Sequence, residues 1–335
     1  MKVWNLVAEA KKIGIKTVLD MDDYWNYGQE HPAFNICIAN DYPIKATVNF
    51  SLFDFITVTT ERFKNEIYPY NRNVFVLENA ISKNDPQFTT NKIPSKRLRF
   101  GLTGGASHTN DIKQIVNENE SVFDYLDKDM IDHIQFVLCG FNTKGKRIKI
   151  DENGNQTQED LNTDEIWWVQ LEKQITKDYS IVSPEYKELL LKYDGSDEHY
   201  DASNEPYKRI WSKSIKDFEY GKIYDNIDVL MVPLTDTKFN SMKSELKFTE
   251  SGFTNTAVMS SNVKPYTDYG THGVNCIFVE DMTPKGWAYN MIRLYEIECL
   301  RDGIAFELNK KILKERDIDL ISKKRDKLYS SMVKK

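Results

Sequence analysis

Two lysines and a glutamate stand at regular spacing just after an apolar run in the second half of the chain. Lys243, Lys247 and Glu250 occupy positions i, i+4 and i+7, which predicts that their side chains share one helix face. Ammonium groups supply point charges for a diphosphate, and a carboxylate can accept the two hydroxyl protons of a ribose. The pattern is compatible with a site for a nucleoside diphosphate-sugar. The alternative is a solvated helix face with ion pairs.

A glycine-containing tract, GLTGGASHTND, offers a second part of such a site. Gly101, Gly104 and Gly105 would let the backbone approach a ligand closely, and the next helix would present free N–H groups to an anion. Ser107 lies in the same loop, and His108 could donate a hydrogen bond to a phosphate. The tract matches neither G-x-G-x-x-G nor a Walker loop. A helix-capping or surface role for His108 is therefore the alternative.

Three aspartates, Asp20, Asp22 and Asp23, cluster around the end of another predicted strand. Clustered carboxylates can bind a divalent cation, act as a general base or accept sugar hydroxyl protons. Capping of a helix is the alternative for Asp22 and Asp23. Further along, Ser260 ends a strand and Tyr266 follows in a loop, where its ring could pack against a ligand. A polar loop without function is the alternative there.

These residues must be positioned by strands and helices that alternate along the chain, a pattern that predicts parallel α/β sheets. Strands are predicted at 17–19, 53–60, 73–81, 97–105, 133–141, 228–234, 256–261 and 275–280. A hairpin with its turn at ENGN is predicted within an insertion at about 142–176, and a helix over 207–221. In parallel sheets, ligands bind beyond the carboxyl ends of the strands. The candidate residues follow such ends.

The composition limits the classes of protein to which this chain can belong. The 335 residues, 40% of them apolar and 29% charged, suffice for two domains with their own cores. No apolar window approaches the roughly 18 residues of a membrane span, and the N-terminus lacks a signal-peptide core. Four scattered cysteines argue against a zinc site and a disulfide scaffold, and predict a cytoplasmic protein. The net charge of −6 disfavours a large nucleic-acid footprint.

Taken together, these motifs resemble the GT-B glycosyltransferases, in the retaining branch that uses nucleotide-sugars (glycosyl transferases group 1, family 4-like). RFGLTGGASHTNDI is similar to the first strand and glycine loop of the family's C-terminal domain, and F-N-x-x-K-S-x-x-K-x-x-E to its donor tract. The resemblance implies two Rossmann-like domains facing across a cleft. They would be an incomplete N-terminal domain at 1–90 and a nucleotide-sugar domain at 97–285. Helices at 286–335 would follow.

The resemblance also implies roles for individual residues. The implied donor-binding residues are Gly104, Gly105, Ser107, His108, Lys243, Lys247, Glu250, Ser260 and Tyr266. The implied catalytic residues are Asp20, Asp22, Asp23, Lys243 and Lys247. The lysines would neutralise the departing diphosphate, so that neither a metal nor a cofactor is required. The aspartates would face the cleft from the acceptor side.

A hexosyltransferase-like enzyme with a UDP- or GDP-sugar donor is therefore expected. Its acceptor could be a glycan, a lipid-linked sugar, a protein or a modified nucleic-acid base. Two departures from the family matter. Met242 stands where many relatives have a glutamate, which leaves the donor-sugar contacts open, and the N-terminal domain has fewer strands than the family's. A second chain could complete that domain. Alternatively, the chain is a catalytically reduced binding or structural module, or a nucleotide-sugar epimerase on a similar fold.

Overall fold

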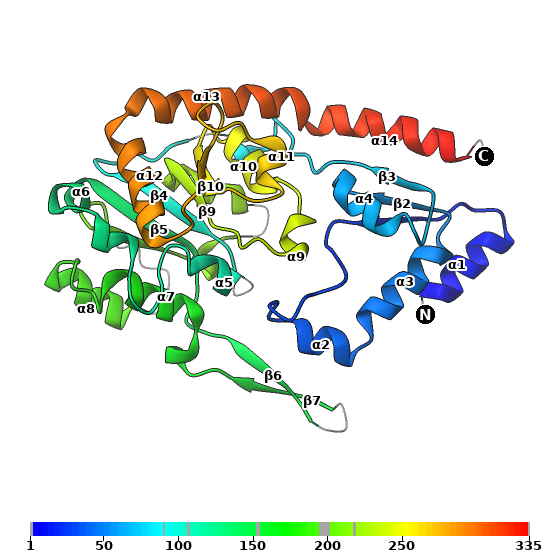
Figure 1. Cartoon of the computed structure of the whole chain (residues 1–335), viewed down its shortest axis with the longest axis horizontal. Helices are drawn as coiled ribbons and strands as arrows, with labels where there is room; N and C mark the ends of the chain where they lie inside the picture. The colour runs from blue at the N-terminus through cyan, green and yellow to red at the C-terminus, as the bar shows by residue number, and fades with distance from the viewer. Residues whose placement is uncertain are drawn as a thin grey trace.

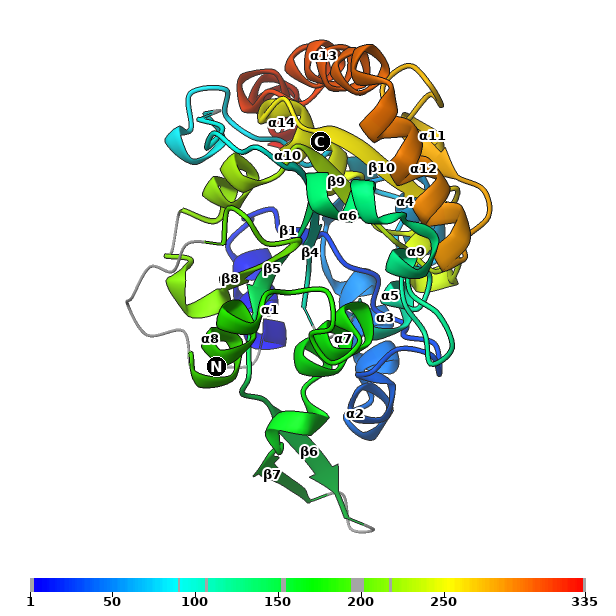
Figure 2. The same cartoon turned by 90° about the vertical axis from the view of Figure 1, so that its left-hand side faces the viewer.

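The computed structural model describes residues 3–89, 91–105, 108–151, 155–193, 202–216 and 219–333. It contains a three-stranded sheet, a six-stranded sheet and a two-stranded hairpin that projects from the body (Figure 1, Figure 2). Helices finish the chain, as predicted, and the expected α/β class is confirmed. Within these residues, no helix combines the length and apolar character that a membrane crossing requires.

The smaller sheet forms the first half of the molecule, with strand order β1-β2-β3. Its elements are α1 (Val3–Lys12), β1 (Val18–Met21), α2 (Phe34–Ala39), α3 (Tyr42–Leu52), β2 (Phe55–Val58), α4 (Glu61–Ile67) and β3 (Val74–Val76). All three strands run parallel, so their carboxyl ends meet at one edge of the sheet. Thr60 caps α4, and its hydroxyl accepts the Phe63 N–H at 3.2 Å.

The larger sheet has the strand order β11-β10-β9-β4-β5-β8. Its strands are β4 (Leu98–Thr103), β5 (Ile134–Phe141), β8 (Tyr207–Trp211), β9 (Val229–Val232), β10 (Ala257–Ser261) and β11 (Ile277–Val279), all parallel. Two central strands, β4 and β9, are adjacent although more than a hundred residues separate them. The order of the strands along the chain reverses at this point. Such a switch point is where open parallel sheets bind ligands.

Helices cover both faces of the larger sheet and link it to the first half (Figure 1). They are α5 (Thr109–Ile112), α6 (Lys128–His133), α7 (Trp167–Thr176), α8 (Pro184–Lys192), α9 (Lys238–Ser241), α10 (Leu246–Phe253), α11 (Tyr266–Tyr269), α12 (Pro284–Glu296), α13 (Glu298–Glu315) and α14 (Ile318–Val333). The described 3₁₀ helices are η1 (Pro86–Phe88), η3 (Val122–Tyr125), η4 (Thr163–Glu165), η5 (Ser212–Ser214) and η6 (Tyr220–Asn226).

The predicted helix over 207–221 is wrong. Tyr207–Trp211 form the edge strand β8, and the 3₁₀ helices η5 and η6 follow it. Buried and partly buried side chains alternate along β8, which is the period of a strand. The sequence did not indicate this strand, because the charged residue Arg209 stands at a position that the alternation requires to be buried. Arg209 is buried there, and its Nε lies 2.5 Å from Glu172 Oε1 of α7.

The predicted hairpin is confirmed by the antiparallel pairing of β6 (Lys146–Ile150) with β7 (Gln156–Asp160). Residues 152–154 of its predicted turn lie outside the described residues. The same stretch also contains α7, whose Trp168 and Leu171 pack in the main core. Only the hairpin therefore projects from the body (Figure 2). The predicted domain limits remain a prediction.

The segment that connects the smaller sheet to the larger one is hydrogen-bonded to the second half of the molecule. The ammonium of Lys92 donates to the Tyr224 carbonyl at 2.9 Å and to the Thr256 hydroxyl at 2.7 Å. After α13 the chain returns to the first half as α14 (Figure 1), where Lys324 pairs with Glu78 at 2.7 Å. The two halves are thus joined by the segment around Lys92 and again by the last helix, α14.

Candidate functional site

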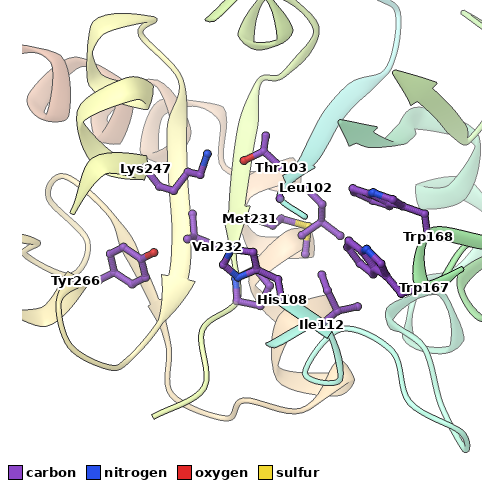
Figure 3. Close-up of a pocket in the computed structure, with 12 residues that line it drawn as sticks. Leu102, Thr103, His108, Ile112, Trp167, Trp168, Met231, Val232, Lys247 and Tyr266 are labelled. Atoms are coloured by element: carbon purple, nitrogen blue, oxygen red, sulfur yellow. The ribbon is translucent and has the colours of Figure 1, made fainter. Parts of the chain in front are cut away.

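A pocket lies beyond the carboxyl ends of β4 and β9, at the switch point of the larger sheet (Figure 3). Its walls are Leu102, Thr103, Gly104, His108, Ile112, Trp167, Trp168, Met231, Val232, Pro233, Lys247 and Tyr266. Lys247 and Tyr266 lie across the pocket from the two tryptophans, and His108 stands between the two sides (Figure 3). Four of the predicted donor-site residues therefore meet in one pocket.

Lys247, which is half-buried, and Glu250, which is buried, form an ion pair on α10. Lys247 Nζ lies 3.0 Å from Glu250 Oε2, and their side chains are 24% and 6% exposed. Burial acts to lower the pKa of Lys247, but the Glu250 carboxylate and the Tyr220 hydroxyl raise it overall, so the ammonium stays charged. The Tyr224 hydroxyl donates to Glu250 Oε2 at 2.6 Å. Among the described residues, the hydrogen bonds of this carboxylate all reach Oε2, which leaves Oε1 to accept from a ligand.

Lys243 does not share the helix face of Lys247 and Glu250, so that prediction is wrong. The helix α10 begins at Leu246, and Lys243 belongs to the turn between α9 and α10. Its ammonium lies 5.2 Å from the centroid of the Phe239 ring. Burial lowers its pKa, and the carboxylates of Asp111 and Asp23 offset part of that effect. The two lysines therefore bring their charges to different parts of the site.

His108 is held by a carboxylate that the sequence reading did not single out. His108 Nδ1 lies 2.7 Å from Asp111 Oδ2, in the segment that follows the glycine tract. The other carboxylate oxygen, Oδ1, accepts the Thr235 N–H at 2.7 Å and the Asn240 amide at 3.4 Å. Asp111 thus ties the loop after β4 to the loop after β9. With Nδ1 engaged, Nε2 is the ring nitrogen that remains for a ligand.

The three glycines of the tract have different surroundings. A methyl group on Gly104 would lie 3.1 Å from the His108 ring, whereas one on Gly105 would meet nothing within 4 Å. Gly101 lies inside β4, where a methyl group would lie 2.6 Å from Ile227, so Gly101 serves packing and not ligand approach. Ser107 lies outside the described residues.

The aspartates of the first half lie at the facing edge of the smaller sheet. Asp20 belongs to β1 and accepts a hydrogen bond from the Thr57 hydroxyl at 2.5 Å, and all three aspartates are exposed. Partial desolvation and repulsion from Asp22 raise the pKa of Asp23, while Lys243 and His31 act to lower it. Asp23 is therefore the aspartate that faces charges from the second half.

Of Ser260 and Tyr266, only Tyr266 lines the pocket. Ser260 is fully buried in β10, and its hydroxyl has no hydrogen-bond partner among the described residues. Tyr266 lines the pocket and stacks on Phe248 of α10, with ring centroids 5.0 Å apart and planes at 8°. Its ring thus supports the helix that carries Lys247. The roles of these two residues remain predictions.

Several residues of the site escaped the sequence reading. Trp167 and Trp168 stack on each other at 4.2 Å and line the pocket, although they lie within the predicted insertion, where they begin α7. Tyr220 and Tyr224 hold the Lys247–Glu250 pair from a 3₁₀ helix. The adjacent tryptophans, and the tyrosines spaced at i and i+4, could have indicated site residues. In a chain this rich in aromatic residues, however, such residues are first expected to pack in the core.

A scan with protein-family models gives no match to this sequence, and a sequence search of curated proteins gives none either. Solved structures are similar in fold. Alr3699/HepE from Anabaena, in complex with UDP-glucose, superposes with a TM-score of 0.62 at 10% identity, covering 97% of this chain and 75% of that one. Sucrose-phosphate synthase from Thermosynechococcus elongatus gives a TM-score of 0.59 at 10% identity, with 98% and 72% covered.

The pneumococcal O-GlcNAc transferase GtfA, in complex with UDP and GlcNAc, is also similar. It gives a TM-score of 0.58 at 12% identity and covers 98% of this chain and 54% of its own. At such identities the likeness concerns the fold. It confirms the architecture that the sequence motifs predicted.

Proposed function

We propose that this chain, which has the GT-B glycosyltransferase fold, transfers a sugar from a nucleoside diphosphate-sugar to an acceptor hydroxyl. The observation that carries the proposal is Lys247, which lines the pocket beside the glycine turn at the switch point of the larger sheet and forms an ion pair with the buried Glu250. That location favours a ligand with phosphates and a ribose, because it combines fixed positive charge, a carboxylate oxygen and bare backbone. UDP is the proposed nucleotide, because solved structures of HepE and GtfA are complexes with it.

In the proposed reaction, the bond between the anomeric carbon and the diphosphate breaks and a bond to the acceptor oxygen forms. Lys247 neutralises the negative charge that develops on the leaving diphosphate, and Lys243 adds a second charge from the cleft side. Glu250 Oε1 accepts protons from the ribose hydroxyls. Asp23 is the proposed recipient of the acceptor's proton, because its raised pKa makes it a better base than an ordinary aspartate.

The resident cations support a metal-independent mechanism, since they supply the charge stabilisation that a divalent ion would otherwise give. Retention of the anomeric configuration is proposed from the resemblance of the donor tract to the retaining branch. A cytoplasmic location is proposed as well, because Cys37, Cys139, Cys276 and Cys299 are all free thiols.

Donor turnover tests this proposal. The purified chain is incubated with UDP- and GDP-sugars, with and without a pool of candidate acceptors, and released nucleoside diphosphate is measured. We expect release from one donor class, at least tenfold slower in Lys247→Met. Chelation by EDTA should leave the rate unchanged if no metal takes part. Absence of release from every donor would count against an enzyme.

A binding or structural module is the second candidate function. The observation that favours it is the small first sheet, whose three described strands leave little surface for an acceptor domain. Such a module would bind UDP with the same residues but would not release it from UDP-sugars. Nucleotide binding without turnover would therefore select this candidate.

A further inference from the structure

A second cavity is formed by the second half of the molecule alone. One wall is a face of α7, on which Trp167, Gln170 and Gln174 stand at positions i, i+3 and i+7. The opposite wall is the segment 109–120, which follows the glycine tract. The cavity has a volume of about 490 Å³, which is within the range of small-molecule sites. Among the described residues, only Ile112 and Trp167 line both this cavity and the pocket described above.

A turn in the second wall is held by its own hydrogen bonds. The side-chain oxygen of Asn117 accepts the backbone N–H of Asn119 at 2.9 Å and that of Glu120 at 3.2 Å. The Asn117 N–H in turn donates to the Glu120 carbonyl at 2.9 Å. Glu118 and Asn119 therefore line the cavity from a turn that is already ordered, and a ligand would not have to order it.

The polar side chains of this cavity are accessible to a ligand. Glu118, Asn119 and Gln174 are exposed, and their side chains make no hydrogen bond or ion pair within the part of the chain that the structure describes. Gln170 is exposed as well, and its amide donates to the Asp164 carbonyl at 3.1 Å, which leaves its side-chain oxygen to accept. Donors and acceptors from both walls are therefore available to one ligand.

An aromatic ring and apolar side chains complete the cavity. Trp167 is half-buried, and its stacking on Trp168 at 4.2 Å fixes the orientation of its indole. Ile112, Val116 and Leu171 are buried and add apolar surface. An indole offers a flat apolar face to C–H groups and an N–H donor at its edge. The cavity thus combines apolar surface with hydrogen-bonding groups.

We infer that this cavity binds an uncharged sugar, as an accessory glycan-binding site separate from the donor pocket. A pyranose ring has C–H groups that pack on an indole, and its hydroxyls both donate to and accept from carboxamides. The charged lining residues are Lys113, Glu118 and Glu120, so the walls have no excess of positive charge that would attract a phosphate or a nucleic acid. The inference goes beyond the proposed function, because it requires no reaction at the donor pocket.

Saturation-transfer NMR titrations of the full chain test this inference. The probes are the uncharged trisaccharides maltotriose, cellotriose, mannotriose and N-acetylchitotriose, with trigalacturonic acid and a short oligothymidylate as anionic counterparts. The cavity variant carries Asn119→Ala and Gln174→Ala, which remove one exposed carboxamide from each wall. The matched control carries Asn35→Ala and Gln158→Ala, which remove two exposed carboxamides that do not line the cavity.

We expect at least one uncharged trisaccharide to bind, about tenfold more weakly to the cavity variant because hydrogen bonds are lost, and with unchanged affinity to the control. The single variant Gln174→Ala, which alters one exposed helix residue, should show part of this loss even if the double variant does not fold. The inference is overturned if no uncharged trisaccharide binds, if the cavity and single variants bind as tightly as the unaltered chain, or if an anionic probe is preferred. Failure of the unaltered chain to bind UDP would instead count against the proposed function, so the two failures can be told apart.

Discussion

At the scale of single residues, the two lysines differ in how firmly they hold their charge. Burial lowers the pKa of Lys243, whereas the pKa of Lys247 is raised by Glu250 and Tyr220 against the effect of its burial. Lys243 attracts a diphosphate only while protonated, so its contribution is complete at low pH and is lost as the pH rises through its pKa. That loss begins at a lower pH than it would for an ordinary lysine.

We therefore expect UDP affinity to fall between neutral pH and about pH 10. Lys243→Arg should shift this fall to higher pH, because a guanidinium remains charged throughout. Isothermal titration calorimetry across this range measures the effect. If the arginine variant and the unaltered chain lose affinity at the same pH, Lys243 does not contact the diphosphate.

We predict that Glu250 contacts the ribose of the nucleotide. Its Oε1 would accept hydroxyl protons, so the chain should bind UDP about tenfold more tightly than 2′-deoxy-UDP, which is about 1.4 kcal/mol. In Glu250→Gln this preference should shrink to twofold or less, because the amide is a weaker acceptor. Competition binding with the two nucleotides measures both values. Equal affinity of the unaltered chain for both would contradict the assigned role.

At the scale of elements, the position of α10 depends on a close approach to α13. A methyl group on Gly252 would lie 2.5 Å from Ile312 Cγ1, and the Gly252 carbonyl already accepts the Asn309 amide at 2.7 Å. Gly252→Ala should therefore force the two helices apart and lower the free energy of unfolding by about 1–3 kcal/mol. Because α10 carries Lys247 and Glu250, UDP affinity should fall as well.

Gly303 on α13 provides the matched control. It is exposed in the helix interior, and a methyl group there would meet nothing within 4 Å. Gly303→Ala should raise the free energy of unfolding by up to about 1 kcal/mol, since alanine favours the helix. Urea denaturation measures both variants. A Gly252→Ala protein as stable as the unaltered chain would show that α10 is not held by this contact.

The elements of the site could be predicted from sequence where local patterns were strong. The buried strands β2, β4, β5 and β9 follow from apolar runs, and the Lys247–Glu250 spacing follows from helical geometry. Lys243 was wrongly predicted to lie in the helix, because the start of a helix depends on the turn before it. The i, i+4, i+7 spacing of side chains carries no information about that turn. The strand β8 was missed because its buried Arg209 is stabilised by Glu172, a partner distant in sequence.

The remaining site residues come together only through tertiary structure. Asp111 is only three residues from His108 along the chain, but its link to Thr235 and Asn240 exists only because β4 and β9 are neighbours. Likewise, the tryptophans of α7 reach the pocket because α7 packs on the larger sheet. Such contacts depend on strand order, which the motifs of a single sequence do not specify.

At the scale of the whole molecule, the two halves meet through Phe239 and Met242, which pack in the apolar core of the first half, and through exposed ion pairs. Arg62 pairs with Asp268 at 2.7 Å and Lys238 with Glu66 at 2.8 Å, and each pair joins one residue from each half. Pairs this exposed contribute little to stability and are weakened by salt. They can nevertheless bias the halves toward a closed arrangement.

We expect the radius of gyration, measured by small-angle X-ray scattering, to increase when salt is raised from low concentration to about 1 M, where screening is strong. The double variant Asp268→Asn with Glu66→Gln should be expanded already at low salt and respond little to added salt. Its free energy of unfolding should change by less than about 2 kcal/mol. A double variant as compact and as salt-sensitive as the unaltered chain would show that these pairs do not control closure.

The central claim is that a nucleoside diphosphate binds against Lys247 beside the glycine turn, and a thermal-shift titration with UDP and GDP tests it most directly. At a hundred times its dissociation constant, a bound nucleotide should stabilise the fold by about 2.7 kcal/mol and raise the midpoint of unfolding. The shift should vanish in Lys247→Met, which keeps the buried stem, and persist in Lys113→Met, which alters an exposed lysine. No shift with either nucleotide, or an undiminished shift in Lys247→Met, would contradict the account.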